Sequence, residues 1–420
     1  MRKLLIVCAI AFVAQSILAN PLSPKITNVS VSSPKGGALN VSYDLDEDAI
    51  VTMTVSISGT DLTAETVRTL VGDVNHKVAA GTARTIVWKA YKDCKGLKVA
   101  AGQLSVSLTA WPSVRPPDYM VCDLRAESSD RIRYYASSND VPGGVTNRMY
   151  KSDYLLMRYI PAAMVKHRQG NPTTATVRGN NETAHYCTLS EDYYMAVYEF
   201  TEAQYALVGG SRAKTTSFDV ADGEDARYYP LTGVYWYNNV RSDGHSVART
   251  DPPNPNSILG KLNTRAGVST FDLPTDAQWE YACRAGTDTS LYDGTEAAYN
   301  GSGLTRLQAL AWIGGENTAN AGGHPHEVGL KTPNAWGLYD MLGNIREWCR
   351  DGNAAYTNDA DVADPLLSGN YMMRGGCWND GPYNCRSPYR NDSHGGWSGE
   401  TNGNWKYYGF RVMCAIPAER

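Results

Sequence analysis

Hydrophobic and polar residues alternate with a period of two along several short segments between residues 24 and 110. The alternating apolar positions are Val29 and Val31; Leu39, Val41, Tyr43 and Leu45; Val51, Met53, Val55 and Ile57; and Leu104, Val106 and Leu108. Turn-forming sequences such as Ser58-Gly59-Thr60 separate these segments. Alternation of this kind is typical of strands with one buried face. The pattern predicts an all-β module over residues 24–110, most simply an immunoglobulin-like sandwich.

The pattern changes after this module. Residues 111–153 begin with a proline-rich stretch, Trp111 to Pro117, which predicts a stiff linker followed by an extension of a second domain. The second domain is expected over residues 154–420. Its first apolar runs, 155–161 and 193–200, are typical of strands.

Two helices are expected in the second domain. The first spans residues 201–207, with Thr201 as its N-terminal cap. The second spans residues 274–283, where Thr275 precedes Gln278 by three residues, the spacing of a capping box. Glycine and asparagine are frequent beyond this helix, which predicts long loops.

Residues 1–19 have the features of a secretory signal peptide. Arg2 and Lys3 form a basic start, an apolar run follows from Leu4 to Leu18, and the small residue Ala19 precedes a cleavage position. The apolar run is shorter than the roughly 20 residues that a membrane-spanning helix requires. We therefore expect an exported protein, either secreted, periplasmic or at the cell surface, without a membrane span.

Charge and cysteine content narrow the choice of partners and metals. The formal net charge is −4, and loss of Arg2 and Lys3 with the signal peptide would make it −6. This balance predicts no nucleic-acid partner. Eight of the nine cysteines lie outside the signal peptide, which permits disulfides in an exported protein but does not fix their pairing. No two cysteines have CxxC spacing, so nothing indicates a structural zinc site.

Four sequence blocks follow one another in the last 150 residues. They are LPTDAQWEYACRAGT (Leu273–Thr287), NAWGLYDMLGNIREWCRD (Asn334–Asp351), MRGGCWND (Met373–Asp380) and YYGFRVMCA (Tyr407–Ala415). Together they resemble the formylglycine-generating enzyme family, also called the sulfatase-modifying-factor domain, from about Tyr154 to the C-terminus. The resemblance implies a decorated C-type-lectin-like domain with little regular secondary structure. The whole chain is thus expected to be α+β, with the β-sandwich first.

The resemblance also implies where catalysis would occur. Active members oxidise a sulfatase cysteine to formylglycine, with two cysteines after the RGG sequence that bind copper(I). Here Cys377 stands at a serine position of the family, and Asp380 stands where the first catalytic cysteine belongs. Cys385 stands at the position of the second catalytic cysteine when residues are counted without gaps. A carboxylate does not replace a thiolate as a ligand of copper(I).

Two interpretations of the cysteines follow from the resemblance. In the first, Cys377 and Cys385 form a displaced copper site, which their separation of eight residues permits. In the second, Cys385 forms a disulfide with Cys283, because active members join a cysteine at the end of the WEYxC helix to this region. A further departure supports the loss of catalysis: active members carry asparagine two residues before GFR, where this chain has Tyr407.

A second candidate site is the sequence GNIREW. In the family this loop binds a structural calcium ion, and matching positions imply Gly343, Asn344, Ile345 and Glu347 as ligands. Backbone carbonyls and a carboxylate suit such a hard cation. The alternative is that Glu347 forms hydrogen bonds with neighbouring backbone.

The leading functional hypothesis is a binding module that has lost copper chemistry. The chain has 27 tyrosines and 10 tryptophans but only 5 phenylalanines, and such amphipathic rings either contact ligands or satisfy buried backbone groups. We expect Trp348, Trp378 and Tyr389 to contact a protein, peptide or glycan ligand. The alternative is an active formylglycine-generating oxidase, for which copper would be the cofactor and Cys377 and Cys385 the thiol pair.

Overall fold

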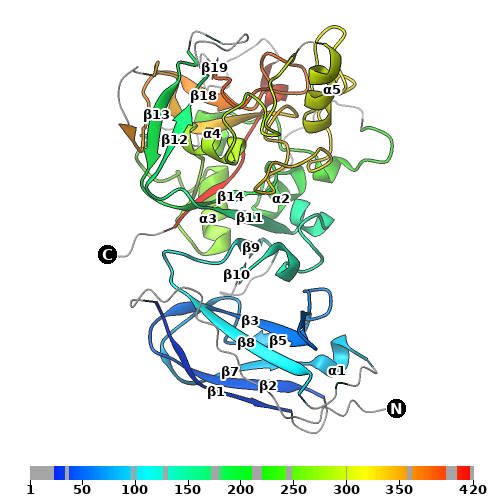
Figure 1. Ribbon diagram of the computed structural model, residues 1–420. Helices are drawn as coiled ribbons and strands as arrows, with labels where there is room; N and C mark the ends of the chain where they lie inside the picture. Colours follow the sequence, from blue (N-terminus) through cyan, green and yellow to red (C-terminus); the bar gives the residue numbers. More distant parts are fainter. Residues whose placement is uncertain are drawn as a thin grey trace. The chain divides into compact units, whose positions relative to one another are not determined.

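The computed structural model describes residues 23–33, 37–95, 99, 102–125, 131–171, 179, 181–210, 220–242, 248–298, 300–356, 362–393 and 404–416 (Figure 1). The predicted signal peptide, residues 1–19, lies outside the described residues. The chain divides into two compact units: unit 1 is Met1–Val121, Ile132–Asn147 and Pro417–Arg420, and unit 2 is Cys122–Arg131 and Arg148–Ile416.

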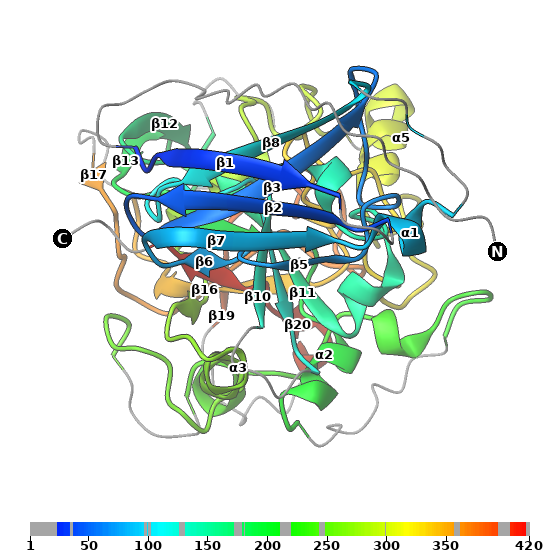
Figure 2. The same cartoon turned by 90° about the horizontal axis from the view of Figure 1, so that it is seen from below.

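Unit 1 contains the strands that the alternating pattern predicts. Its elements are β1 (Ile26–Ser32), β2 (Leu39–Leu45), β3 (Ala49–Ile57), β4 (Thr60–Asp61), β5 (Leu70–Gly72), β6 (Lys77–Val78), β7 (Gly81–Trp88), the short helix α1 (Ala90–Asp93) and β8 (Leu104–Trp111). One antiparallel sheet has the order β1-β2-β7-β5, and these strands lie side by side in Figure 2. In the other sheet, β3 pairs with β4, β6 and β8.

The core of unit 1 explains this arrangement. The inward residues of β2 and β3, such as Val41 and Val55, pack in one cluster with those of β7 and β8, such as Trp88 and Val106. The alternation along β2 is regular, with every second residue buried. The two sheets therefore share one hydrophobic core. The immunoglobulin-like topology stays a prediction.

Unit 2 combines strands, short helices and long connections. Strand β9 (Tyr119–Asp123) includes residues of both units, and β10 (Ile132–Tyr135) belongs to unit 1. The elements that follow are β11 (Tyr154–Ile160), β12 (Val165–Gln169), β13 (His185–Leu189), β14 (Tyr193–Ala196), α2 (Glu202–Leu207), α3 (Ile258–Ala266), β15 (Phe271–Asp272), α4 (Asp276–Arg284), α5 (Gly301–Leu310), β16 (Arg346–Gly352), β17 (Val362–Ala363), β18 (Tyr371–Arg374), β19 (Asn391–Ser393), β20 (Tyr408–Gly409) and β21 (Met413–Ala415).

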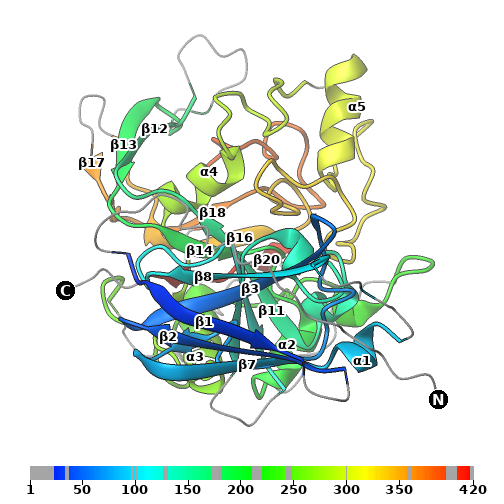
Figure 3. The same cartoon turned by 60° about the horizontal axis from the view of Figure 1, so that its bottom comes forward.

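Three groups of strands build unit 2. Strands β11, β14, β21 and β15 pair in that order, all antiparallel. Strand β13 pairs antiparallel with β12 and parallel with β17. Strand β16 pairs antiparallel with β18 and parallel with β20, and Figure 3 shows β16 beside β18. The described part of the chain is thus richer in strand than in helix, as the α+β prediction requires.

The structure contains both helices that the capping residues predicted, α2 and α4. Thr201 caps α2 and Thr275 caps α4, and each threonine accepts a hydrogen bond from the backbone N–H three residues on. In turn, the side-chain oxygens of Gln204 and Gln278 accept a hydrogen bond from the backbone N–H of Thr201 and Thr275, so both are complete capping boxes. Helix α4 is buried along most of its length and packs its apolar residues into the main core of unit 2.

None of the helices in the described residues has the length and apolar character needed to cross a membrane.

Candidate functional site

The RGG sequence forms a tight turn at the end of β18. Gly375 and Gly376 have φ angles of +88° and +71°, the left-handed region that glycine adopts without strain. A Cβ atom on Gly376 would lie 2.7 Å from the Cys385 sulfur and 2.6 Å from the Asn384 carbonyl oxygen. Glycine at this position therefore lets the segment that begins at Cys377 fold against the segment that contains Cys385.

Both cysteines of the candidate site are free, buried thiols. Cys385 Sγ lies 3.9 Å from the carbonyl oxygen of Cys377 and 3.9 Å from that of Asp380. Burial raises the pKa of the Cys377 thiol, and it raises the pKa of the Cys385 thiol well above its ordinary value. Because metal ligation and nucleophilic attack require the thiolate, this environment does not activate either sulfur.

The expected disulfide between Cys283 and Cys385 is not formed in this structure. Cys283 is also a free thiol, whose Sγ lies 3.4 Å from Ser387 Oγ and 3.8 Å from the Met341 carbonyl oxygen. Burial raises the pKa of Cys283 to about 12. The three cysteines act as small apolar residues of the interior.

Asp380 forms a buried ion pair with Arg346. Arg346 Nη2 donates to Asp380 Oδ1 at 2.6 Å, and Nε donates to Oδ2 at 2.8 Å, a bidentate geometry. The side chains are 7% and 15% exposed, respectively. The backbone N–H of Cys377 and the amide of Asn384 also donate to the carboxylate. Burial acts to raise the pKa of Asp380, but the hydrogen bonds and charge of Arg346 outweigh it and hold the pKa below its ordinary value.

These residues do not fit a copper(I) site of the family kind. Copper(I) requires two soft thiolates, whereas one position holds a carboxylate already neutralised by a guanidinium. The thiols of Cys377 and Cys385 are protonated at neutral pH because burial raises the pKa of both. A displaced copper site at these cysteines stays a prediction.

The predicted calcium loop is held by contacts within the protein. Asn344 Nδ2 donates to Glu199 Oε2 at 2.6 Å, and the backbone N–H of Ile345 donates to Glu199 Oε1 at 3.2 Å. Asn344 Oδ1 accepts from the backbone N–H of His326 at 2.9 Å. At Gly343, a Cβ atom would lie 2.2 Å from the Trp312 carbonyl oxygen, which explains the glycine.

Glu347, the carboxylate of this loop, also has protein partners. Arg411 Nη2 donates to Glu347 Oε1 at 2.8 Å, and Trp279 Nε1 donates to Oε2 at 2.6 Å. Among the described residues, no group of three or more histidine, cysteine, aspartate or glutamate side chains is placed to hold a metal ion. The contacts of Glu347 favour a structural role, and calcium binding by residues 343–347 stays a prediction.

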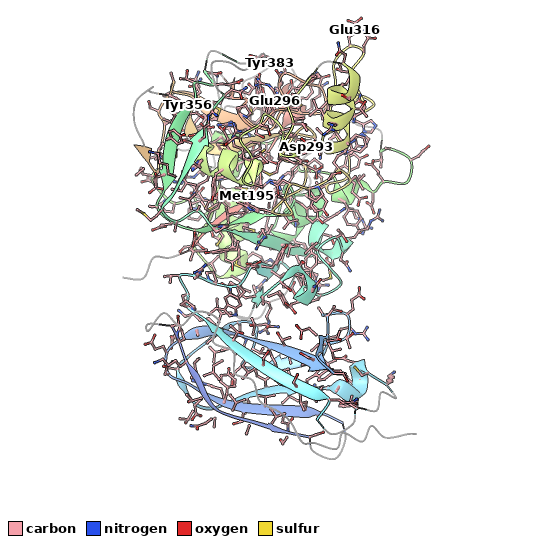
Figure 4. The ribbon with its side chains drawn as sticks, viewed as in Figure 1. Met195, Asp293, Glu296, Glu316, Tyr356 and Tyr383 are labelled. Carbon is pink, nitrogen blue, oxygen red and sulfur yellow. The ribbon has the colours of Figure 1, made fainter. Side chains whose placement is uncertain are left out.

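The aromatic residues predicted to bind a ligand lie at different depths. Trp348 is 0% exposed, and its indole N–H donates to the Val234 carbonyl oxygen at 2.9 Å. Trp348 therefore has no exposed surface that a ligand could contact, and the prediction that it is a ligand-contacting residue is wrong. Trp378 is only 4% exposed, whereas Tyr389 is partly exposed and contacts Tyr383 edge to face at 5.7 Å. Figure 4 shows Tyr383 near the end of unit 2 that carries β18 and β19.

Trp378 belongs to a set of rings and cations beside Asp380 whose other members were not predicted from the sequence. Ala321, Cys377 and Trp378 form a small buried cluster, and the partly buried rings of Trp312 and Tyr407 pack against it. Lys331 Nζ lies 3.6 Å from the centre of the Trp312 ring. Lys406 Nζ lies 5.6 Å from the Trp378 ring and 5.2 Å from the Tyr407 ring. We call Trp312, Trp378, Tyr407, Lys331 and Lys406 the aromatic–lysine cluster. The surplus of tyrosine and tryptophan was its only signal in the sequence.

The charged residues of the four sequence blocks mainly bind one another. Arg374 of RGG forms an ion pair with Asp276 and another, at 2.9 Å, with Glu280. Arg411 of GFR pairs with Glu347 of REW at 2.8 Å. All these side chains are at most 1% exposed. Residues that identify the family in the sequence therefore stabilise the fold through buried ion pairs. The chemistry of the candidate site depends on other residues.

A surface pocket lies elsewhere in unit 2, between the C-terminal ends of α2 and α3. Arg131, Lys261 and Arg265 are among its lining residues. The guanidinium of Arg265 donates to the Leu207 carbonyl oxygen at 2.7 and 3.1 Å, and so completes the end of α2. No residue of the candidate site lines this pocket.

Unit 2 is an α+β domain in which charged residues of the four blocks form buried ion pairs. A model of the family described as "Sulfatase-modifying factor enzyme 1-like domain" matches residues 158–416. The chain therefore belongs to this family, and the resemblance inferred from the four blocks is confirmed.

Individual relatives agree with the family assignment. The chain is 30% identical over 192 residues to the chaperone protein LppX of Paenibacillus barcinonensis, covering 39% of this chain and 62% of LppX. It is 30% identical over 145 residues to the formylglycine-generating enzyme of Thermomonospora curvata, covering 33% of this chain and 46% of the enzyme. The formylglycine-generating enzyme of Bos taurus is 25% identical over 299 residues, which cover 63% of this chain and 75% of the enzyme. The matches to the first two relatives thus span about half to three fifths of their length.

Among solved structures, Treponema denticola variable protein 1 is 22% identical with a TM-score of 0.49, covering 63% of this chain and 96% of that protein. PvdO from Pseudomonas aeruginosa is also 22% identical, with a TM-score of 0.47, covering 62% and 95%.

Proposed function

We propose that this chain is a binding member of the family, exported from the cell, which uses the surface around Asp380 to bind a segment of another polypeptide. The observation that carries the proposal is the ion pair between Asp380 and Arg346. It fixes a carboxylate, with its countercharge, at the position that the family resemblance assigns to the first copper thiolate. The site thereby keeps its shape and loses the ligand that oxidation chemistry requires.

The nature of the relatives supports a polypeptide as the ligand. One relative is named a chaperone, and others are named formylglycine-generating enzymes, whose active members act on a cysteine within a sulfatase chain. Binding of a polypeptide is a property that such proteins share whether or not they catalyse a reaction. Partly exposed rings next to Asp380, including Tyr407 and Trp312, supply surface for such contacts.

Copper binding is the first test of this proposal. The mature protein is titrated against a copper(I)–bicinchoninate complex under a reductant, beside the formylglycine-generating enzyme of Thermomonospora curvata as a positive control. We expect the enzyme, and not this protein, to withdraw copper from the chelator. Withdrawal of one copper ion per chain that is lost in both Cys377→Ser and Cys385→Ser would instead establish the oxidase alternative.

Ligand class is the second test. The mature protein is applied to an array of peptides and to an array of glycans under the same conditions. We expect a subset of peptides to be bound, with reduced binding for a Tyr407→Ala variant and unchanged binding for a Tyr186→Ala variant. Tyr186 is an exposed tyrosine of β13, so it controls for the loss of a surface ring. Binding to glycans alone, or to neither array, would contradict the proposal.

A further inference from the structure

The two lysines of the aromatic–lysine cluster have no salt-bridge partner among the described residues. Arg346 also lies over the Tyr407 ring, at 5.6 Å, but its charge is neutralised by Asp380. Lys331 and Lys406 form no salt bridge with any carboxylate of the described residues. The one hydrogen bond of the Lys331 ammonium goes to a neutral acceptor, the Gln308 carbonyl oxygen, at 2.5 Å.

Among the described residues, none of Glu224, Asp340 and Glu316 forms a salt bridge with these lysines. Glu224 is bound to His326 Nδ1 at 2.6 Å and to the backbone N–H of Glu327 at 2.8 Å. Asp340 acts electrostatically on Lys331 but forms no ion pair with it. Glu316 follows α5 and points outward from the end of unit 2 in Figure 4, and it makes no salt bridge with either lysine.

Each lysine is partly withdrawn from water by a ring. Lys331 lies over the Trp312 ring. The His326 ring also stacks on Trp312, with 3.7 Å between the ring centres. Burial lowers the pKa of Lys331 to about 8, although Asp340 acts in the opposite direction. A partly desolvated ammonium held by a ring has lost part of its hydration and gains more from an incoming anion than a fully hydrated one would.

From these contacts we infer that the polypeptide ligand is acidic, and that Lys331 and Lys406 bind its carboxylates while Trp312 and Tyr407 contact the chain between them. This inference rests on the proposed function, because it specifies the ligand of the same surface. Two ammonium groups that form no salt bridge with a carboxylate of the described residues, both packed on rings of one cluster, are complementary to glutamate- or aspartate-rich segments. An acidic glycan offers similar charge, and tighter binding of such a glycan at the same lysines would contradict the inference.

The test compares two peptides of equal length and labelling on the mature protein. One alternates glutamate with glycine and tyrosine, and the other carries glutamine at every glutamate position. We expect the glutamate peptide to bind at least tenfold more tightly at low ionic strength, with the difference shrinking as salt is raised because salt screens partly exposed charges. Equal binding of the two peptides would overturn the inference and leave the proposed function standing. Failure of the protein to bind any peptide would overturn both.

Variants locate the binding. We expect Lys331→Gln and Lys406→Gln each to weaken binding of the glutamate peptide by roughly fivefold, the order of a single partly exposed charge contact. Binding of the glutamine peptide should not change. The conservative changes Lys331→Arg and Lys406→Arg should retain most of the affinity, which separates loss of charge from loss of fold.

A matched control comes from another lysine that lies over an exposed ring. Lys166 of β12 lies 4.9 Å from the Tyr186 ring, and Lys166→Gln should leave affinity unchanged. Equal losses in Lys166→Gln and Lys331→Gln would show that the peptide responds to overall charge and would contradict the assignment. A sulfated oligosaccharide that binds through Lys331 and Lys406 more tightly than the glutamate peptide would also contradict it.

Discussion

The side chain of Asp380 is held in place by several hydrogen bonds within unit 2. The carboxylate accepts hydrogen bonds from Arg346, from the Cys377 backbone and from Asn384. Each of these contacts would be lost or weakened if a thiolate occupied the position. Asp380 therefore forms part of the turn after RGG, and its charge stabilises that turn.

We predict that Asp380→Asn destabilises the protein, because it leaves the Arg346 guanidinium buried without a countercharge. Breaking a buried pair in this way costs about 3 kcal/mol of unfolding free energy. Urea unfolding checks the value. The exposed pair of Asp225 and Arg227 supplies the control, since Asp225→Asn should leave the unfolding curve where it is. The double variant Asp380→Asn with Arg346→Met should regain part of the loss. A single variant as stable as the parent protein would contradict the ion-pair account.

Asp351 provides a second prediction at the residue scale. Its carboxylate is buried and accepts from the backbone N–H groups of Asp276, at 2.6 Å, and Leu367, at 3.3 Å. Burial, and then the neighbouring charge of Asp276, raise the pKa of Asp351 to about 7. A raised pKa means that the folded state holds the proton more tightly than the unfolded state. The contribution of Asp351 to stability is therefore complete below about pH 4 and is lost as the pH rises to about 7.

The change Asp351→Asn removes this titration. The unfolding free energy of the variant relative to the parent protein should increase by about 2 kcal/mol between pH 5 and pH 8. Paired denaturation curves at several pH values measure the difference directly. If the difference between the two proteins is independent of pH, Asp351 does not have a raised pKa in the folded state.

At the scale of the element, the helix α4 and the loop before β16 hold the site in place. Helix α4 contributes Asp276 and Glu280 to the ion pairs with Arg374, so its position fixes the end of β18. Its N-terminus is fixed in turn by the capping box of Thr275 and Gln278. The loop at residues 343–347 is anchored by Glu199 and by Arg411.

The capping box of α4 should contribute measurably to stability. Thr275→Ala removes the oxygen that accepts from the Gln278 backbone N–H, and such a change costs about 1 kcal/mol. Asn300 at the start of α5 is a matched control, because its side chain makes no capping hydrogen bond. Thermal or urea unfolding of Thr275→Ala and Asn300→Ala should show a loss in the first variant alone. Similar losses in both would mean that the cap is not the cause.

Metal removal tests the loop at residues 343–347. Because both oxygens of Glu347 accept from Arg411 or Trp279, we expect the chelator EDTA to leave the melting temperature unchanged. Differential scanning fluorimetry with EDTA, and then with excess calcium, measures this. A fall of several degrees that calcium reverses, and that is absent in Asn344→Ala, would establish the calcium site of the family instead.

Local sequence signals predicted elements well, whereas the site depends on contacts that are distant in sequence. The strands of unit 1 follow from alternation, α2 follows from its threonine cap, and α4 follows from a capping box whose two residues are three positions apart. These signals act between near neighbours. The pairing of Glu347 with Arg411 spans 64 residues and has no local signature. Trp348 was misassigned because most residues of β16 are buried on both faces, so the strand shows no alternation that would mark an outward ring.

At the scale of the whole molecule, the chain joins a unit of two sheets around one core to a domain of the sulfatase-modifying factor family. The family residues stabilise the fold of unit 2, since Arg411 forms a buried ion pair with Glu347 and Arg374 forms another with Glu280. We propose that function is decided by other positions of unit 2. In this chain those positions are Asp380 and the aromatic–lysine cluster, which together favour binding over oxidation.

The measurement that tests this account most directly is an assay for formylglycine formation. The mature protein is loaded with copper(I) and incubated with a reductant, oxygen and a cysteine-x-proline-x-arginine sulfatase peptide, and the peptide is read by mass spectrometry. The formylglycine-generating enzyme of Thermomonospora curvata serves as the working control. We predict that the peptide stays unconverted with this protein while the control converts it. Conversion that disappears in Cys377→Ser and Cys385→Ser would contradict the account, because it would show that a rearranged thiol pair carries out the chemistry despite Asp380.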